Sequence, residues 1–171
     1  MQEKQILDYG IVRLVDFMGG DSAVVQSARV SFGKGVTNDE RDRKLVFFLM
    51  ANGHETPFEH SVFKFHIKCP IFVARQWFRH RMASYNEISG RYTEMKEEFC
   101  LPDKLRTQKM RNYQYEELDT ALNSSLRKKI ENHYTASFDL YQELLEAGVA
   151  KEHARIVLPL SLYTQFYWTV N

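Results

Sequence analysis

The hydrophobic and polar positions of this chain change their period several times along its 171 residues. Residues 61–69 and 162–170 show side chains alternating with a period of two, which predicts a strand in each segment. Residues 6–17 alternate more loosely and are followed by two glycines, which predicts a first strand closed by a turn. Residues 92–99 are interpreted as a further strand.

Helical periodicity covers much of the rest of the chain. From about Tyr115 to Ala147 apolar residues recur at intervals of three and four, and Gly148 follows, which predicts one long helix. Thr37 and Glu40 have the spacing of a capping box at the start of another helix. Shorter helices are predicted at 22–30, 37–52, 71–81 and 150–158, and loops at 33–35 and 83–91.

The order of these elements predicts the fold class. Helices and strands are mixed without a regular strand–helix–strand alternation, so we expect an α+β fold with a largely antiparallel sheet flanked by helices. The chain lacks repeats, linkers and low-complexity segments, which predicts a single domain over residues 1–171. The helix at 71–81 is apolar almost all round and is expected to be largely buried. In the helix at 37–52, the buried stripe is expected to be Leu45, Phe48 and Leu49.

Composition excludes several classes of function. A formal net charge of +1 gives no long-range field for a polyanion, so general nucleic-acid binding is not expected. The longest apolar runs, such as 45–51, fall far short of the roughly 20 residues that a membrane-spanning helix needs. Cys69 and Cys100 match no zinc or redox spacing, and no signal peptide is recognised, so we expect a protein of the reducing cytoplasm.

The segment RHRMASYNEISGR, from Arg79 to Arg91, is the strongest candidate for a binding site. Guanidinium groups bind phosphate in a bidentate manner, and backbone N–H groups of the Ser89-Gly90 turn can hold the same oxygens. The segment therefore predicts a site for a small phosphorylated ligand. Two plainer interpretations stay open, a solvated helix end and an ionic network in which Glu87 balances the arginines.

A second cluster lies in the segment HETPFEH, residues 54–60. His54, Glu55, Glu59 and His60 suggest a metal site, but neither zinc motif of this composition is present and Pro57 interrupts the helix that such motifs require. We expect no metal. Neither cysteine has an adjacent base, so neither is expected to act as a nucleophile.

The segment RHRMASYNEISGR contains every fixed residue of the RHR-x-x-S-x-N-E-x-S-x-R signature of flavin-dependent thymidylate synthases. The segments HETPFEH, IFVARQWF and ARIVLPL also resemble this family, in the same chain order. The resemblance implies conversion of dUMP to dTMP, with methylenetetrahydrofolate as the carbon donor and FAD, reduced by NADPH, as the hydride donor. It also implies that no cysteine of the enzyme attacks the uracil.

The resemblance further implies the roles of individual residues. Arg155 is expected to stabilise charge on the pyrimidine, and His54 to act in proton transfer or positioning near the flavin or folate. The residues implied for dUMP are Gln76, Arg79, Glu87, Ser89, Gly90, Arg91 and Arg155. Those implied for FAD are Ser31, Thr56, Glu59, Arg79, His80, Arg81, Met82, Asn86, Glu87 and Asn171.

Family members are homotetramers whose active sites combine several subunits, which the resemblance also leads us to expect for this chain. They normally continue beyond the position of Asn171 with a helical segment, and we expect that segment to be missing from this sequence. Two other interpretations are retained, a phosphate- or nucleic-acid-binding module and an inactive remnant with a structural role. The mixture of Gln76, Asn86, Glu87 and Ser89 with the arginines favours recognition of a whole nucleotide.

Overall fold

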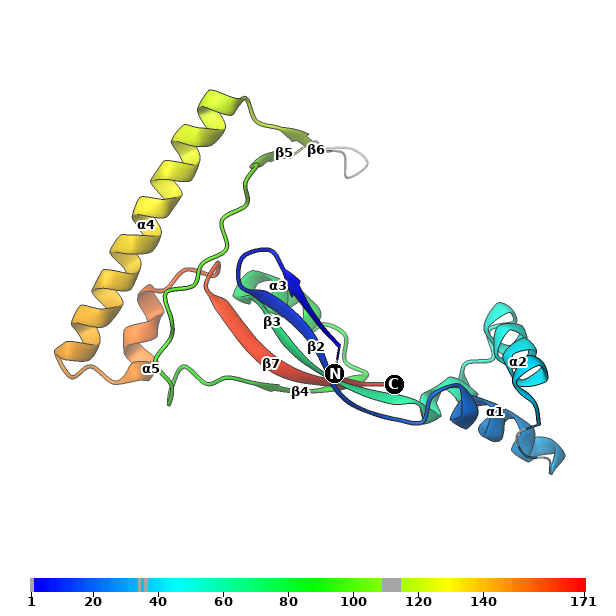
Figure 1. Cartoon of the computed structure of the whole chain (residues 1–171). Coiled ribbons are helices and arrows are strands. Elements are labelled where there is room, and N and C mark those ends of the chain that lie inside the picture. Colours follow the sequence, from blue (N-terminus) through cyan, green and yellow to red (C-terminus); the bar gives the residue numbers. More distant parts are fainter. Residues whose placement is uncertain (1, 34, 36, 109–114) are drawn as a thin grey trace. The chain divides into compact units, whose positions relative to one another are not determined.

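The computed structural model describes residues 2–33, 35, 37–108 and 115–171 (Figure 1). The strands are β1 (Glu3–Ile6), β2 (Gly10–Met18), β3 (Val62–Pro70), β4 (Ala83–Glu87), β5 (Arg106–Gln108), β6 (Tyr115–Glu117) and β7 (Tyr163–Val170). The α-helices are α1 (Asp21–Arg29), α2 (Asp39–Ala51), α3 (Ile71–Trp77), α4 (Thr120–Glu146) and α5 (Lys151–Ala154). Short 3-10 turns are η1 (Val30–Phe32), η2 (Thr56–His60) and η3 (Arg155–Val157).

Within the described residues, five strands form one sheet in the order β1-β2-β3-β7-β4. β1 pairs with β2, β2 with β3 and β4 with β7, each in antiparallel register. β5 and β6 form a separate antiparallel pair that the sequence did not predict. The predicted α+β class, with a largely antiparallel sheet and one long helix, is confirmed.

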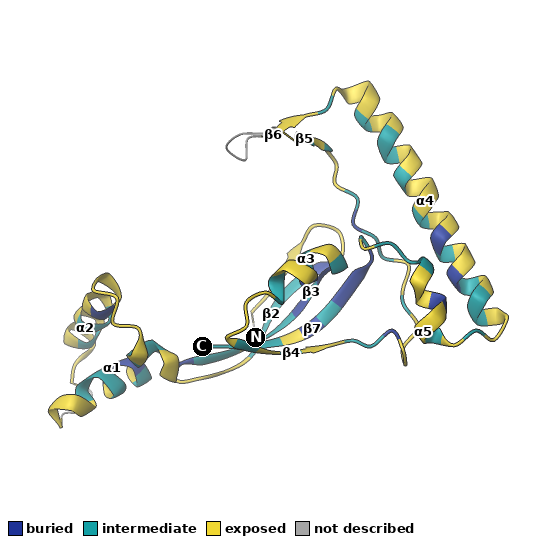
Figure 2. Cartoon of the chain, turned by 180° about the vertical axis from the view of Figure 1, so that it is seen from behind, coloured by how far each residue is buried: buried dark blue, intermediate teal, exposed yellow. Residues whose placement is uncertain are grey.

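The chain divides into two compact units. Unit 1 comprises Met1–Lys68, Trp77–Glu87 and Gln165–Asn171, and unit 2 comprises Cys69–Gln76 and Ile88–Thr164. In unit 1 the core is aromatic: the Trp77 ring meets Phe166 at 5.9 Å and Trp168 at 5.2 Å, both edge-on. In unit 2 the fully buried Tyr141 of α4 uses its hydroxyl to accept a hydrogen bond from the Met95 N–H at 3.0 Å. α4 exposes one long side (Figure 2).

Several predicted elements are wrong at their boundaries. The first strand is a hairpin, because Leu7 adopts a positive φ of 54° and the chain turns between β1 and β2. The helix predicted at 71–81 ends at Trp77 and buries only Ala74, so the RHR segment follows the helix instead of ending it. Residues 83–87 form β4, where a loop was predicted. Residues 92–99 form no strand beyond an isolated bridge from Phe99 to Leu162.

The helix starts also differ from the predicted caps. The N-cap of α2 is Asn38, whose side chain accepts a hydrogen bond from the Arg41 N–H at 3.0 Å. Thr37 instead donates its hydroxyl to Asp42. The long helix was predicted to begin at about Tyr115, but Tyr115–Glu117 form β6, and α4 begins later because the side chain of its N-cap Asp119 accepts a hydrogen bond from the Leu122 N–H. The predicted stop at Gly148 is confirmed by its φ of 83°. Of the loop predicted at 33–35, Lys34 lies outside the described residues.

Candidate active site

The Ser89-Gly90 turn of unit 2 lies directly against Arg155. A Cβ placed on Gly90 would be 3.2 Å from Cδ of Arg155 and 3.3 Å from Sδ of Met95. Gly90 is buried, so a side chain here could not turn outwards without moving its neighbours. The lack of a side chain lets the backbone of the predicted phosphate loop approach the arginine closely. Three residues predicted from the sequence, Ser89, Gly90 and Arg155, are thereby brought together.

Arg91 is held at the same turn by contacts that the sequence did not reveal. Its Nε donates a hydrogen bond to Oε2 of Glu152 at 3.0 Å, and its guanidinium lies 5.5 Å from the ring centroid of Tyr92. The Ser89 hydroxyl accepts from the Arg91 N–H at 3.3 Å, so the turn is also closed locally. Because the bond to Glu152 uses Nε, the N–H donors on Nη1 and Nη2 are the ones that can bind a ligand.

The loop after Arg91 is fastened to α5 by a second ion pair. Nζ of Lys151 lies 3.2 Å from Oε1 of Glu94. Lys151 directly precedes Glu152, the partner of Arg91. Arg155 follows directly as the C-cap of α5 and the first residue of η3. Two guanidinium groups, a serine hydroxyl and the turn's backbone N–H groups therefore share one region of unit 2, and such a set stabilises an anion. Gln76 is exposed near the end of α3, and no described hydrogen bond joins it to this group.

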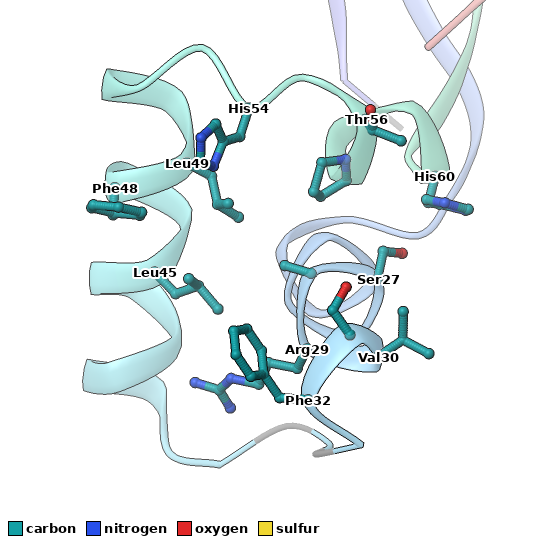
Figure 3. Close-up of a pocket in the computed structure, with 13 residues that line it drawn as sticks. Ser27, Arg29, Val30, Phe32, Leu45, Phe48, Leu49, His54, Thr56 and His60 are labelled. Atoms are coloured by element: carbon teal, nitrogen blue, oxygen red, sulfur yellow. The ribbon is translucent and has the colours of Figure 1, made fainter.

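Unit 1 contains an open pocket of about 930 Å³ between α1, η1, α2 and η2 (Figure 3). Ser31, Thr56 and His54 all line it, as expected for residues near a cofactor. Its walls were not predicted: they include Phe32, Leu45, Phe48 and Leu49, together with polar groups of Ser27 and His60. The pocket therefore combines an apolar aromatic wall with hydroxyl and imidazole groups.

Phe48 and Phe32 are exposed although they are large and apolar. Phe48 was expected in the buried stripe of its helix, but 56% of it is exposed, and only Leu49 of that stripe is buried. Phe32 is 80% exposed. Both line the pocket, and Figure 3 shows the Phe32 ring in the space between η1 and α2. Exposed aromatic surface around a hollow is typical of a ligand site, because a flat ligand can cover it.

The end of α2 positions His54. The Gly53 backbone has a positive φ of 66°, which reverses the chain, and the His54 N–H then donates to the Leu49 carbonyl at 2.9 Å. The imidazole ring packs edge-on to Phe48 at 6.0 Å between ring centroids. The Asn52-Gly53 helix stop, which the sequence predicts, therefore places His54 at the pocket wall.

The other residues predicted for FAD do not line this pocket. Arg79, His80, Arg81 and Met82 form an exposed segment between α3 and β4. At the same end of the β4–β7 pair, Met82 precedes the Ala83–Val170 pairing and Asn171 follows it. Glu59, Asn86 and Glu87 are likewise exposed and outside the pocket lining.

Tyr85 fixes the RHR segment to the sheet, a role that the sequence did not reveal. Its hydroxyl donates to the His80 carbonyl at 2.7 Å. Its ring packs against Phe78 at 4.9 Å, and Phe78 in turn meets the buried Phe166 at 4.8 Å. Two aromatic residues thus hold the backbone on both sides of Arg79–Arg81, while those three side chains stay accessible.

The two cysteines, Cys69 and Cys100, are both buried and form no disulfide. Within the described ranges, no group of three His, Cys, Asp or Glu residues is arranged to hold a metal ion. None of the helices in the described part of the chain is both long and apolar enough to cross a membrane.

Two guanidinium groups beside a glycine turn have the chemistry of a site for phosphorylated small molecules. Residues 13–171 match the family model of the thymidylate synthase complementing proteins. The chain is 57% identical over 171 residues to a flavin-dependent thymidylate synthase of Thermosipho africanus, covering 99% of this chain and 75% of that protein.

Two further comparisons agree. A flavin-dependent thymidylate synthase of Thermus thermophilus is 56% identical over 166 residues, which are 95% of this chain and 60% of that protein. The solved structure of a UMP/dUMP methylase from Streptomyces cacaoi, bound with 5-Br dUMP, superimposes with a TM-score of 0.85 at 37% identity. That match covers 95% of this chain and 73% of the other. The chain therefore belongs to the flavin-dependent thymidylate synthase family, as its sequence motif predicts.

Proposed function

We propose that this chain methylates dUMP to dTMP with methylenetetrahydrofolate as the carbon donor and NADPH as the reductant. The predicted methyltransferase activity and the flavin cofactor are confirmed by membership of the family. The neighbouring methylase of known structure is bound with a dUMP analogue, which supports dUMP as the substrate of this chain. The assignment of the nucleotide site rests mainly on one observation, the close approach of Gly90 to Arg155. A Cβ on Gly90 would lie 3.2 Å from Cδ of Arg155.

The nucleotide phosphate is assigned to Ser89, Gly90 and Arg91. A phosphate needs several donors from one side, and this turn supplies the Ser89 hydroxyl, which can still donate while it accepts from the Arg91 N–H, and the Arg91 guanidinium. Arg155, next to the turn, is assigned to the pyrimidine, where its fixed positive charge would stabilise negative charge developing on the ring. Gln76, Arg79 and Glu87 are proposed as further contacts to the nucleotide on the strength of the family motif.

The unit 1 pocket fits FAD by its chemistry. Phe32 and Phe48 offer aromatic surface to a flat ring system, while Ser31 and Thr56 offer hydroxyl groups to a polar chain. When bound and reduced by NADPH, FAD supplies the hydride that turns the transferred one-carbon unit into a methyl group. His54, packed on Phe48, would position a ligand against this wall or move a proton there. Glu59, His80, Arg81, Met82, Asn86 and Asn171 are proposed as further FAD contacts.

Several residues proposed for FAD do not line the unit 1 pocket. A homotetramer with shared active sites would explain this, because one subunit could contribute these residues to the pocket of another. Large apolar side chains are exposed next to proposed site residues: Met82 is 86% exposed and Ile156, after Arg155, is 78% exposed. Contact with further copies would bury them and could add Arg79–Arg81 of a neighbour to each pocket. Because the two buried cysteines form no disulfide, a reducing cytoplasm suits the chain.

An absorbance spectrum of the purified protein tests the cofactor assignment. We expect a flavin spectrum, either as purified or after addition of FAD, followed by NADPH oxidation that depends on dUMP. A colourless protein that takes up no added FAD would contradict the proposal. A phosphate-binding module or an inactive remnant would bind dUMP without forming dTMP, so product analysis separates them from the enzyme.

A further inference from the structure

Outside the residues assigned so far, one compact polar cluster in unit 1 joins the two walls of the pocket. Arg29, the last residue of α1, forms an ion pair with Asp42 of α2, with Nη2 and Oδ1 2.6 Å apart. Nη1 of Arg29 donates to the Thr37 hydroxyl at 2.9 Å and to the Gly35 carbonyl at 3.0 Å. Thr37 in turn donates its hydroxyl to Oδ1 of Asp42 at 2.9 Å. We call Arg29, Thr37 and Asp42 the clamp.

The clamp lies where the chain passes from one pocket wall to the other. Arg29 is followed by η1, which carries Ser31 and Phe32 into the pocket. Asp42 lies one turn before Leu45, the first pocket residue of α2. In Figure 3 the Arg29 guanidinium extends towards α2 beside the Phe32 ring. Holding Arg29 to Asp42 therefore sets the spacing between Phe32 and the α2 wall.

The donors of Arg29 are used in a way that suits positioning better than ligand binding. Both hydrogens of Nη1 have partners in Gly35 and Thr37, and the charge is balanced by Asp42 at Nη2. An arginine that binds phosphate needs the donors on Nη1 and Nη2 for the ligand. In Arg91 the bond to Glu152 uses Nε and not these two nitrogens. Arg29 lines the pocket, but its guanidinium forms its hydrogen bonds with other residues of the chain.

The clamp is also better placed than an ordinary surface ion pair. The Arg29 and Asp42 side chains are only 14% and 13% exposed, whereas those of the nearby Lys44–Glu40 pair are 74% and 80% exposed. Exposed pairs contribute little to stability, while shielded pairs with further hydrogen bonds hold their geometry. Burial acts to raise the pKa of Asp42, but hydrogen bonds from Thr37 and the charge of Arg29 outweigh it and lower the pKa.

We propose that Arg29, Thr37 and Asp42 are positioning residues that preorganise the FAD pocket by fixing the η1 wall against α2. The inference rests on the proposed assignment of FAD to this pocket. It predicts that loss of the clamp weakens FAD binding, because the aromatic wall must then be ordered at the moment of binding. Once FAD is bound, the chemistry should proceed at the normal rate, since the polar groups of the clamp bind one another and Gly35 and none is assigned a contact to the substrate.

The test is the dissociation constant of FAD, measured by quenching of flavin fluorescence on the full chain, with wild type beside Asp42→Asn and Thr37→Val. We expect Asp42→Asn to raise the constant about tenfold, and Thr37→Val to raise it less, because the ion pair survives. The dissociation constant for dUMP should stay within roughly twofold, and saturating FAD should restore kcat. Glu40→Gln, which breaks the exposed pair on the same helix, is the matched control and should bind FAD like wild type.

The outcomes separate the clamp from the cofactor assignment. If wild type binds FAD and both clamp variants bind it equally well, the clamp inference is overturned and the FAD pocket stands. If wild type binds no FAD, both are overturned. If Asp42→Asn does not fold, Thr37→Val decides, since it removes one hydroxyl only. A lowered kcat at saturating FAD would also overturn a purely positioning role.

Discussion

Gly90 and Arg155 touch: a Cβ on the glycine would lie 3.2 Å from Cδ of the arginine. The turn assigned to the phosphate and the arginine assigned to the pyrimidine therefore depend on each other's position. A glycine without a positive φ is seldom required for its backbone conformation, so the requirement at Gly90 comes from space.

Gly90→Ala should displace Arg155 or Met95 by a few tenths of an ångström, because the added methyl group would meet both at 3.2–3.3 Å. We expect kcat/KM for dUMP to fall by about 10- to 100-fold, since small displacements of catalytic groups are costly. Steady-state kinetics at saturating FAD measures it. Gly35→Ala is the matched control, because a Cβ there meets nothing within 4 Å. An unchanged kcat/KM for Gly90→Ala would show that the close approach has no functional role.

Arg91→Ala should weaken dUMP binding by roughly 10- to 100-fold, as expected for loss of a charge-assisted phosphate contact. FAD affinity should be retained, because Arg91 does not line the proposed flavin pocket and is not among the residues proposed for FAD. Isothermal titration calorimetry with dUMP measures the first and flavin fluorescence the second. Arg106→Ala removes an exposed arginine of unit 2 that lies over Tyr115 and serves as the control. Equal dUMP affinities for the two variants would refute the role of Arg91.

Phe48→Ala should weaken FAD binding by about tenfold while leaving the melting temperature of the FAD-free protein nearly unchanged, because the ring is already 56% exposed before any ligand arrives. Phe47→Ala is a closely matched control: its ring is 57% exposed on the same helix, but it lines a different hollow. If the two variants bind FAD equally, the pocket between α1 and α2 is not the flavin site.

Asp42 should make the stability of the FAD-free protein depend on pH in the acid range. Its pKa is lowered from 3.8 in the folded chain, so the stabilisation from its carboxylate is present above pH 3.8 and disappears as pH falls through the folded-state value. Asp42→Asn should therefore melt below wild type at pH 7, and the difference should shrink as pH falls below about 4. Asp21, Asp39 and Arg43 line a hollow together with Asp42. Because these groups are charged as well, the melting temperatures of wild type and Asp42→Asn are compared over the whole pH range and not at a single pH. A difference independent of pH would contradict the role of ionised Asp42.

Replacing both cysteines, Cys69→Ala with Cys100→Ala, should leave dTMP formation within a fewfold of wild type. Both thiols are buried, and a nucleophile must reach its substrate. Product analysis after incubation with all substrates measures the effect, with the melting temperature as the control for folding. Complete loss of product in a folded double variant would point to a cysteine nucleophile.

The sequence predicted what depends on local patterns. Period-two alternation located β3 and β7, three- and four-residue spacing located α4, and the motif from Arg79 to Arg91 identified the family. Asn52-Gly53 and Gly148 end helices as expected, because a positive φ is a property of a few residues.

The parts that the sequence did not predict depend on long-range contacts. Nothing local distinguishes Phe48, which faces a pocket, from a core residue of the same helical stripe. Glu152 pairs with Arg91 across 61 residues of sequence, and Tyr85 anchors its segment through Phe78 and Phe166. The strand predicted at 92–99 failed because that segment is held by isolated contacts, such as that of Met95 with Tyr141, and not by a ladder.

The most direct measurement follows one labelled carbon atom. The purified chain is incubated with FAD, NADPH, dUMP and methylenetetrahydrofolate labelled in its methylene carbon, and the nucleotides are then separated. We expect labelled dTMP that forms only when FAD, NADPH and dUMP are all present, and that is lost in a folded Arg155→Ala variant. Unlabelled dUMP recovered unchanged from a protein that binds both FAD and dUMP would contradict this expectation.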